Sequence, residues 1–480
     1  MGQSLWPIIG LKLGPQNLVI LNDHEAVAEY ANGETCGEYL SLPFHRLFDR
    51  RGGIYSSRPP SHIANDLIFQ NSVHPLFLPY GDAWRQLRKA LQDILRTTHV
   101  DDLLPLQDAE ATQTLYDLLH TPDSWYDHIR RYSTAVILAS VFGLRGASYD
   151  SPRVKRLYEV QNQNTAINEL GATPPIDAFP FLKSLPGPLA PWRKWALDIR
   201  VQYRAMLFDL VKESKENSRK PGGPDCFLAK LHRDQEKSGL DDEHVAYLGG
   251  GLVMEAGSDT TASTLLSFLL AMASHPEVLA KCQQEADSIC GPERSPSFKD
   301  MDKFTYLRCT MNETLRWRPV AAGGVPHMLT QDDTYKGYIL PKGTILFANT
   351  WSIHRTADFD DPEAFKPGRW ANSTFGTRDT SVDDEKRRPQ YGFGAGRRIC
   401  QGQRLAENSL MVNMAKLVWA FDIGVATGKT LDTSMETGYI GGFLVCPKEF
   451  PLALRPRSRE RAESIDREMD EVRDFLGRFG

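Results

Sequence analysis

The segment that most constrains this chain is Phe393-Gly394-Ala395-Gly396-Arg397-Arg398-Ile399-Cys400-Gln401-Gly402. A lone cysteine is more often a small buried hydrophobic residue than a ligand. A metal-binding thiolate, however, needs backbone N–H groups to hold it ionised and a site shielded from water, which a glycine-rich turn supplies. A nucleotide-binding loop of the pattern Gly-x-Gly-x-x-Gly is excluded. Counted from Gly392, the third glycine of that pattern would fall at Arg397. Whether Cys400 is a structural residue or a metal ligand therefore depends on what the rest of the segment resembles.

The segment matches Phe-x-x-Gly-x-Arg-x-Cys-x-Gly at every fixed position and so resembles the cysteine-ligand loop of the cytochrome P-450 superfamily. The resemblance implies haem b as the cofactor, with Cys400 as the axial thiolate of its iron. In enzymes of this class, thiolate ligation favours cleavage of the O–O bond. The resemblance also implies that Phe393 covers the sulfur and that Arg398 neutralises a haem propionate. Gly396 and Gly402 would let the backbone turn beneath the sulfur and pack against the ring.

Two more segments resemble haem-contacting parts of the family. Trp84 and Arg88 lie four residues apart, hence on one helical face, and resemble the helix that crosses the propionates. His327 follows the loop 321–326, where the family often places a basic residue against the other propionate. A lone histidine is more often a structural residue, so Arg88 and Arg398 are the stronger pair.

A three-residue network is expected to support the haem pocket. Glu313 and Arg316 form a Glu-x-x-Arg pair, which alone is an ordinary surface ion pair. Downstream, Phe365-Lys366-Pro367-Gly368-Arg369-Trp370 is similar to the family's Pro-x-Arg segment, whose arginine joins that pair in a buried network. We assign Glu313, Arg316 and Arg369 to the integrity of the fold.

A long helix is expected over residues 241–273, with the glycines 249–251 marking a bend or a close approach. Its segment Ala256-Gly257-Ser258-Asp259-Thr260-Thr261 looks like the family's oxygen-activation segment. In that reading the Thr260 hydroxyl hydrogen-bonds dioxygen, Asp259 relays protons, and nearby glycines make room for dioxygen. The alternative is that Thr260 merely bonds the carbonyl of Ala256.

The resemblance covers about residues 5–455 and implies a mainly α fold with a small β region, an α-rich triangular prism around haem. We expect residues 1–455 to form one haem-thiolate monooxygenase domain. Strands are expected at 8–13 and 18–21, and helices at 302–318 and 403–421. The charged tail 456–480 places Ile465, Met469 and Val472 on one helical face. That face could dock on the body or on a partner, but we expect a solvated, frayed terminal helix instead.

Composition and charge exclude several classes of protein and of metal site. A net charge of −5 argues against nucleic-acid binding. The seven cysteines are scattered and include no Cys-x-x-Cys pair, which argues against zinc and iron–sulfur sites and favours a reducing compartment. No apolar run reaches bilayer length and the N-terminus lacks a signal-peptide core, so we expect a soluble chain as written. Family analogy places it facing the cytosol at the endoplasmic reticulum, where membrane association is possible.

The implied activity is insertion of one oxygen atom from O2 into a hydrophobic small molecule, by hydroxylation or epoxidation. Electrons would come from NADPH through a separate flavoprotein reductase, docked at a basic patch of Arg85, Lys89 and Arg397. Similarity to filamentous-fungal members suggests a polyketide, terpenoid or alkaloid substrate. The alternatives are dehydrogenation, cyclisation or phenolic coupling on the same haem fold, and a non-catalytic haem- or ligand-binding protein.

Overall fold

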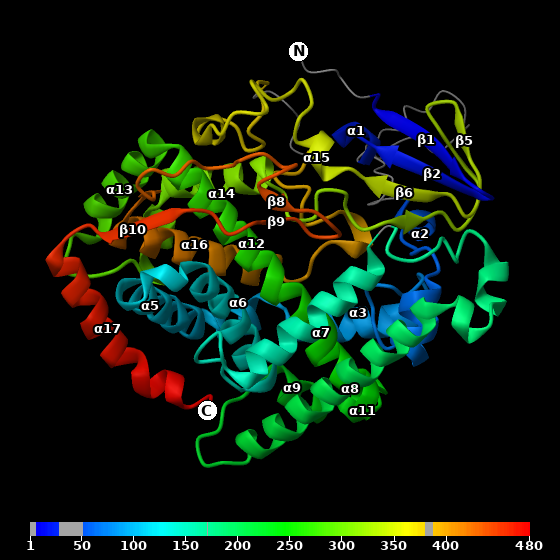
Figure 1. The fold of residues 1–480 in the computed structure, drawn as a ribbon, viewed down its shortest axis with the longest axis horizontal. Coiled ribbons are helices and arrows are strands. Elements are labelled where there is room, and N and C mark those ends of the chain that lie inside the picture. The colour runs from blue at the N-terminus through cyan, green and yellow to red at the C-terminus, as the bar shows by residue number, and fades with distance from the viewer. Residues whose placement is uncertain (1–5, 28–50, 170, 380–386) are drawn as a thin grey trace, which may run out of the picture.

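The computed structural model describes residues 6–27, 51–169, 171–379 and 387–480. The expected strand pair is β1 (Ile8–Leu13) and β2 (Gln16–Leu21), which turns at Gly14 with a φ of +55° and begins its second strand two residues earlier than predicted. This pair lies at one end of the molecule (Figure 1). β2 pairs in parallel with β6 (Ile345–Ala348), which pairs with β3 (His327–Met328). The smaller pairs are β4 (Asp333–Tyr335) with β5 (Tyr338–Leu340), β7 (Phe421–Val425) with β10 (Leu452–Pro456), and β8 (Tyr439–Ile440) with β9 (Cys446–Pro447).

Helices make up most of the remaining body (Figure 1). The helices before the long central one are α1 (His24–Val27), α2 (Gly52–Tyr55), α3 (Asp82–Ile94), α4 (Thr97–Asp101), α5 (Leu104–His120), α6 (Trp125–Phe142), α7 (Pro152–Asn168), α8 (Pro191–Ser218), α9 (Phe227–Arg233), α10 (Gln235–Ser238) and α11 (Asp242–Ala246). They are followed by α12 (Val253–Ser274), α13 (Pro276–Cys290), α14 (Thr305–Trp317), α15 (Thr350–Ile353), α16 (Gln403–Ala420) and α17 (Arg459–Gly477). This mainly α architecture with small sheets is the predicted fold class.

The long helix predicted over residues 241–273 is interrupted. α11 passes into a π-helical segment, Tyr247–Leu252, before α12 begins. The predicted close approach is present there, since a Cβ on Gly250 would lie 2.7 Å from Leu207 and 2.8 Å from Phe142. The π-helical segment therefore coincides with the close approach of α6 and α8.

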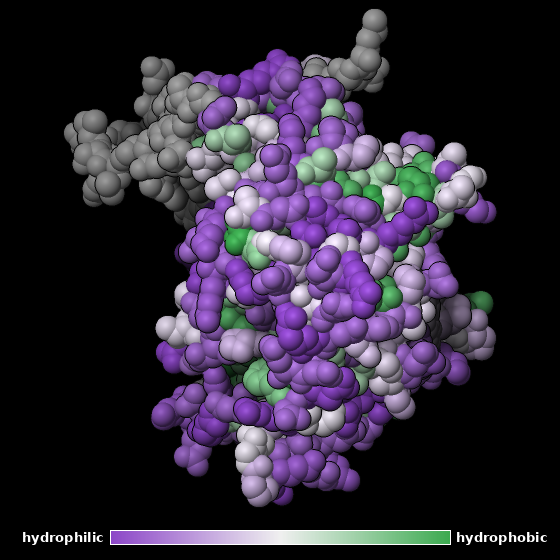
Figure 2. Space-filling view, turned by 90° about the vertical axis from the view of Figure 1, so that its left-hand side faces the viewer, coloured by the Kyte–Doolittle hydropathy of each residue, from purple (hydrophilic) through white to green (hydrophobic). Residues whose placement is uncertain are grey.

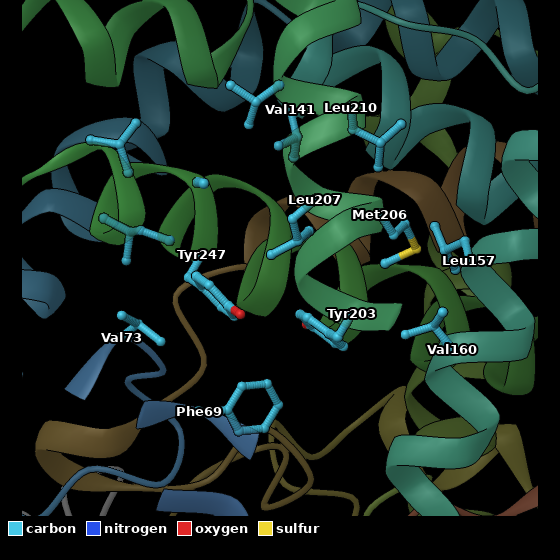
Figure 3. Packing of buried hydrophobic residues seen from close by; sticks show 14 of the residues in the cluster. Phe69, Val73, Val141, Leu157, Val160, Tyr203, Met206, Leu207, Leu210 and Tyr247 are labelled. Atoms are coloured by element: carbon cyan, nitrogen blue, oxygen red, sulfur yellow. The ribbon is translucent and has the colours of Figure 1, made fainter. Parts of the chain in front are cut away.

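Aromatic rings from three elements pack around this π segment (Figure 3). Tyr203 of α8 stacks on Tyr247 with centroids 5.9 Å apart, and the Phe69 ring meets Tyr203 edge-on at 5.3 Å. Edge-on and offset stacks are the favoured arrangements of aromatic pairs. They join α8 and the 62–72 region to the start of the central helix.

The C-terminal tail is not frayed, contrary to our expectation. α17 lies along α5 (Figure 1), and the side chains of Ile465 and Leu476 are fully buried. Glu468 accepts hydrogen bonds from Ser295, whose hydroxyl also accepts one from the buried Lys416 of α16 at 2.7 Å. The side of the molecule that carries α13 and α17 is mostly hydrophilic (Figure 2). The helix therefore docks with its apolar face inward because the body offers complementary polar and apolar partners.

Candidate haem-thiolate site

A cavity of about 340 Å³ lies between α12 and the Cys400 loop. The thiol is exposed to this cavity although it lies deep inside the molecule. Burial raises the pKa of Cys400, and the Gly402 N–H and the Arg88 cation oppose that rise. The other described cysteines (226, 282, 290, 309 and 446) are free thiols, and Cys36 lies outside the described residues.

The Cys400 loop is held by its own backbone. Cys400 N–H donates to the Phe393 carbonyl at 2.8 Å, and Ile399 N–H donates to Gly396 at 3.1 Å. Gly396 has a φ of +61°, which glycine adopts readily, so the predicted turn requires it. Gly402 differs, because its φ of −86° suits any residue and its absent Cβ would make only an ordinary contact of 3.9 Å with the sulfur.

Three arginines line one side of the cavity: Arg58, which is buried, and Arg88 and Arg398, which are half-buried. Burial and the neighbouring Arg88 lower the pKa of Arg58 to about 9, and burial lowers that of Arg88 to about 10. Burial together with Arg58 and Arg88 lowers the pKa of Arg398 to about 8. Within the described parts of the chain, none of the three forms an ion pair with a carboxylate. Buried cations need a counter-charge, so the cavity is built for an anionic group.

Backbone carbonyls and an indole ring fix these guanidinium groups. Arg58 donates to the carbonyls of Val325 (2.9 Å) and Pro326 (2.7 Å). Arg398 donates to those of Ser56 (2.8 Å) and Leu78 (2.7 Å), and its guanidinium lies 4.1 Å from the Trp84 ring. Sequence reasoning missed Arg58, because Ser57-Arg58-Pro59-Pro60 carries neither a helical spacing nor a motif that we recognised.

His327 also lines the cavity, but as a neutral group. Its Nδ1 lies 2.8 Å from the Tyr55 carbonyl, which can only accept, so Nδ1 carries the proton. Burial, Arg58 and Arg398 lower the pKa of His327 well below its usual value. The cations available to a propionate are therefore the arginines.

The structure brings Glu313, Arg316 and Arg369 together in one buried network. Arg316 donates to both Glu313 oxygens at 2.8 and 2.9 Å, and Arg369 Nε lies 3.1 and 3.2 Å from the same two atoms. Trp370 Nε1 and the Lys366 N–H complete the set at 3.0 and 2.8 Å. Arg316 also donates to the carbonyls of His354 and Pro362, so the network ties α14 to the segment that precedes the cysteine loop.

The opposite wall belongs to α12. Thr260 lines the cavity, and its hydroxyl donates to the Ala256 carbonyl at 2.7 Å, the local bond we weighed against an oxygen-binding role. Gly257 also lines the cavity, and the space that a side chain there would need is taken by Ile137 of α6, since a Cβ would lie 2.4 Å from it. Asp259 points away from the cavity, toward Arg130 of α6 and Gln161 of α7, two partners that the sequence did not reveal.

These features fit haem. The cavity is mainly apolar, its three arginines are sufficient to neutralise two propionates, and a thiol opens onto it from one side. Among the described residues, no cluster of three or more His, Cys, Asp or Glu side chains offers a separate metal site. Such a helical body, with a cysteine that opens onto an apolar cavity and arginines along one side of it, defines a haem-thiolate protein.

The chain belongs to the cytochrome P-450 family, whose model matches residues 39–454. It is accordingly a haem-thiolate monooxygenase, an oxidoreductase that incorporates oxygen and works with a redox partner, O2 and a hydrophobic substrate. A cytochrome P-450 monooxygenase of Arthrobotrys oligospora is 34% identical over 99% of this chain and 88% of its own length. The monooxygenases patI of Aspergillus clavatus and yanC of Aspergillus niger are each 35% identical, covering 90% and 96% of this chain and 82% and 85% of the relatives.

Solved structures share the fold. A zebrafish cytochrome P-450 determined with progesterone superposes with a TM-score of 0.73 at 21% identity, covering 94% of this chain and 96% of that one.

As to membrane-spanning segments, no single described helix has both the length and the apolarity to cross a bilayer. Residues 242–274 and 276–290 meet those criteria only jointly, as a pair bent by 107°.

Proposed function

We propose that this enzyme hydroxylates or epoxidises a hydrophobic small molecule of fungal secondary metabolism, such as a polyketide, terpenoid or alkaloid. One atom of O2 enters the substrate and the other leaves as water, with two electrons from NADPH and two protons from solvent. The observation that carries the proposal is the apolar cavity with the Cys400 thiol on one wall and Thr260 on the other. The kinship with patI and yanC, monooxygenases of filamentous fungi, supports the substrate class.

The chain's own residues would hold the cofactor and supply protons. Cys400 would bind the iron, and Arg58, Arg88 and Arg398 would hold the propionates, while Trp84 and Phe393 pack beside them. Haem with a thiolate ligand supplies the activation of dioxygen. On the opposite wall, Thr260 would hold a proton at the cavity surface, and Asp259, with 22% of its side chain exposed, would exchange protons with water.

The first test is the reduced, CO-bound difference spectrum of the wild type and of Cys400→Ala. We expect a strongly red-shifted Soret band in the wild type and none in the variant. A folded, haem-loaded wild type without that band would overturn the Cys400 assignment. Turnover under labelled dioxygen then separates oxygen insertion, with one labelled atom in each product, from dehydrogenation or coupling, with none.

We further propose that electrons arrive from an NADPH-dependent flavoprotein reductase at the face of Arg85, Lys89 and Arg397. The three side chains are exposed, and Arg397 belongs to the cysteine loop itself. Charged residues at the edge of an interface mainly accelerate association of the two proteins and make its rate sensitive to salt. Reversing all three charges should slow reduction by the reductase at low salt and leave reduction by dithionite unchanged. Unchanged reductase-driven rates would exclude this face.

For location, we propose the cytosolic face of the endoplasmic reticulum membrane. Exposed apolar side chains support this: Leu11 (51%), Phe181 (67%) and Leu189 (62%). Gly14, at the turn after Leu11, lies against Phe179, so β1 and the 179–189 loop share one side of the molecule. Phe181→Asp with Leu189→Asp should weaken binding to vesicles of neutral and anionic phospholipid, whereas Ile440→Asp, at another exposed site, should not.

A further inference from the structure

Part of the cavity wall is an irregular segment, residues 319–325, which joins the end of α14 to β3. The residues of this segment that line the cavity are Pro319, Val320, Ala321, Gly324 and Val325. The segment is neither helix nor strand, and its internal backbone bond is the turn from the Gly324 N–H to the Ala321 carbonyl at 3.0 Å. Its position is therefore set mainly by the elements around it.

Arg318 follows α14 and immediately precedes this wall, and its side chain is buried, with 7% of the residue exposed. Within the described parts of the chain, no carboxylate forms an ion pair with it, and burial lowers the pKa of its guanidinium. The cation lies 3.7 Å from the centre of the Trp317 ring and 5.6 Å from those of Trp351 and Tyr439. Contact with three aromatic rings thus stabilises the buried charge in place of a carboxylate.

The guanidinium also joins two parts of the chain that are 115 residues apart. Its Nη1 donates to the Trp317 carbonyl at 3.0 Å, and its Nη2 donates to the Thr433 carbonyl, ahead of β8, at 2.7 Å. Tyr439 of β8 in turn donates its hydroxyl to Ser267 of α12 at 3.2 Å. Arg318 and Tyr439 therefore form a bridge from the 319–325 wall to the helix that carries Thr260.

Backbone bonds tie the wall itself to the elements that this bridge touches. The Val445 N–H, next to β9, donates to the Val320 carbonyl at 2.9 Å. The Trp351 N–H of α15 donates to the Ala322 carbonyl, also at 2.9 Å. The wall has little free space, since a Cβ on Gly324 would lie 2.5 Å from a carbonyl oxygen of β6. A shift of α15 or of the β8–β9 hairpin would therefore move the wall with it.

We propose that Arg318 is a positioning residue that determines which molecules fit the substrate side of the cavity. Together with Tyr439 it holds the 319–325 wall in a fixed place relative to α12, so the bridge sets the width of the space between them. A rigid apolar wall discriminates between molecules by their shape. The inference deepens the proposed function and rests on it, because the same cavity receives the substrate.

The test compares Arg318→Met with Arg461→Met. Arg461 is a matched control, because it is 8% exposed and its guanidinium lies 5.5 Å from the Trp419 ring, but it belongs to α17. Each full-length, haem-loaded protein is titrated with imidazole and with 1-phenylimidazole, and both dissociation constants are read from the shift of the Soret band. Both probes bind through an imidazole nitrogen, whereas the phenyl ring of the second must also fit against the wall.

We expect the Kd of 1-phenylimidazole divided by that of imidazole to rise about tenfold in Arg318→Met, the discrimination that one methylene-sized contact provides in an apolar pocket. The ratio should stay unchanged in Arg461→Met, although that variant also loses a buried cation. Arg318→Lys keeps the charge and should recover part of the wild-type ratio. An unchanged ratio in Arg318→Met would overturn the proposal, and if that variant retains no haem, an unchanged ratio in Arg318→Lys would do so.

Tyr439→Phe removes only the bond to Ser267 and should raise the ratio by a smaller factor. Because Arg318 and Tyr439 act as one bridge, the double variant Arg318→Met with Tyr439→Phe should differ from the wild type no more than Arg318→Met alone. Factors that multiply in the double variant would overturn the bridge. The CO-bound spectrum is recorded first: a wild type without a thiolate band removes the proposed function, whereas a normal band with unchanged ratios removes the role of Arg318 alone.

Discussion

The two walls of the cavity are built in different ways. The cysteine wall comes from one contiguous loop, residues 393–402, fixed by backbone bonds and by arginines that donate to carbonyls. The α12 wall presents Thr260, but the partners of neighbouring Asp259 come from α6 and α7, more than ninety residues earlier in the chain. Substitutions in the cysteine wall should therefore destabilise the fold and weaken haem binding. Substitutions in the α12 wall should change catalysis alone.

The largest effect is expected from Glu313→Gln, behind the cysteine wall. Arg316 and Arg369 would keep their charges in a site where Glu313 and Arg316 are fully buried, so the free energy of unfolding should fall by about 3–5 kcal/mol. Urea unfolding followed by circular dichroism measures it, with the exposed Glu277→Gln as control. A fall no larger than the control's would mean that the network is not structural.

Haem binding should depend on Arg58 more than on His327. Arg58→Leu removes a buried cation facing the cavity. The free energy of haem binding should therefore become less favourable by about 2–5 kcal/mol. His327→Leu should have a smaller effect, because that imidazole is neutral. Titration of the apo-protein with haem, followed by absorbance, ranks the two variants. If haem affinity fell more in His327→Leu than in Arg58→Leu, His327 rather than Arg58 would be the residue that binds a propionate.

Acid should destabilise the cysteine wall through His354, whose Nε2 accepts from the Tyr391 N–H. Burial, Arg316 and Arg355 lower the pKa of His354 to about 3, whereas an unfolded histidine titrates near 6.5. Below pH 6.5 the unfolded chain binds a proton that the folded protein does not, so stability falls by about 1.4 kcal/mol per pH unit down to about pH 3.

Unfolding free energies measured from pH 7 to pH 5 check this dependence. His354→Gln should reduce the slope, even if it lowers stability at pH 7. An equal slope in the wild type and in His354→Gln would show that other groups set the acid sensitivity.

The smallest structural effect is expected on the α12 wall. Thr260→Val should change the unfolding free energy by less than about 1 kcal/mol, because only one local hydrogen bond is lost. Product formed per NADPH should nevertheless fall, with more hydrogen peroxide released. Ser274→Ala removes the same kind of i−4 bond at the end of α12 and should leave this ratio unchanged. Equal coupling in Thr260→Val and the wild type would mean that its hydroxyl has no part in proton supply.

Local sequence patterns predicted much of this molecule. The strands predicted at 8–13 and 18–21 and the helix from Gln403 follow from spacing and residue type, although the second strand begins at Gln16. The turn at Gly396, implied by the family resemblance, has the positive φ that glycine adopts. Glu313, Arg316 and Arg369 could be grouped in advance because their motifs were recognisable together. The frayed tail was wrongly predicted, because the surface that receives α17, including the buried Lys416 behind Ser295, is assembled from distant helices.

The sequence by itself determined the class of protein, and it predicted the cysteine ligand and the acid–alcohol pair, since each lies in a contiguous segment whose chemistry is local. Only the tertiary structure decided which groups those residues meet. Arg58 joins Arg88 and Arg398, Gly257 receives Ile137, and Asp259 is held by Arg130 and Gln161. Such partners are chosen by how helices pack, and packing depends on the shape of the whole body rather than on spacing along the chain.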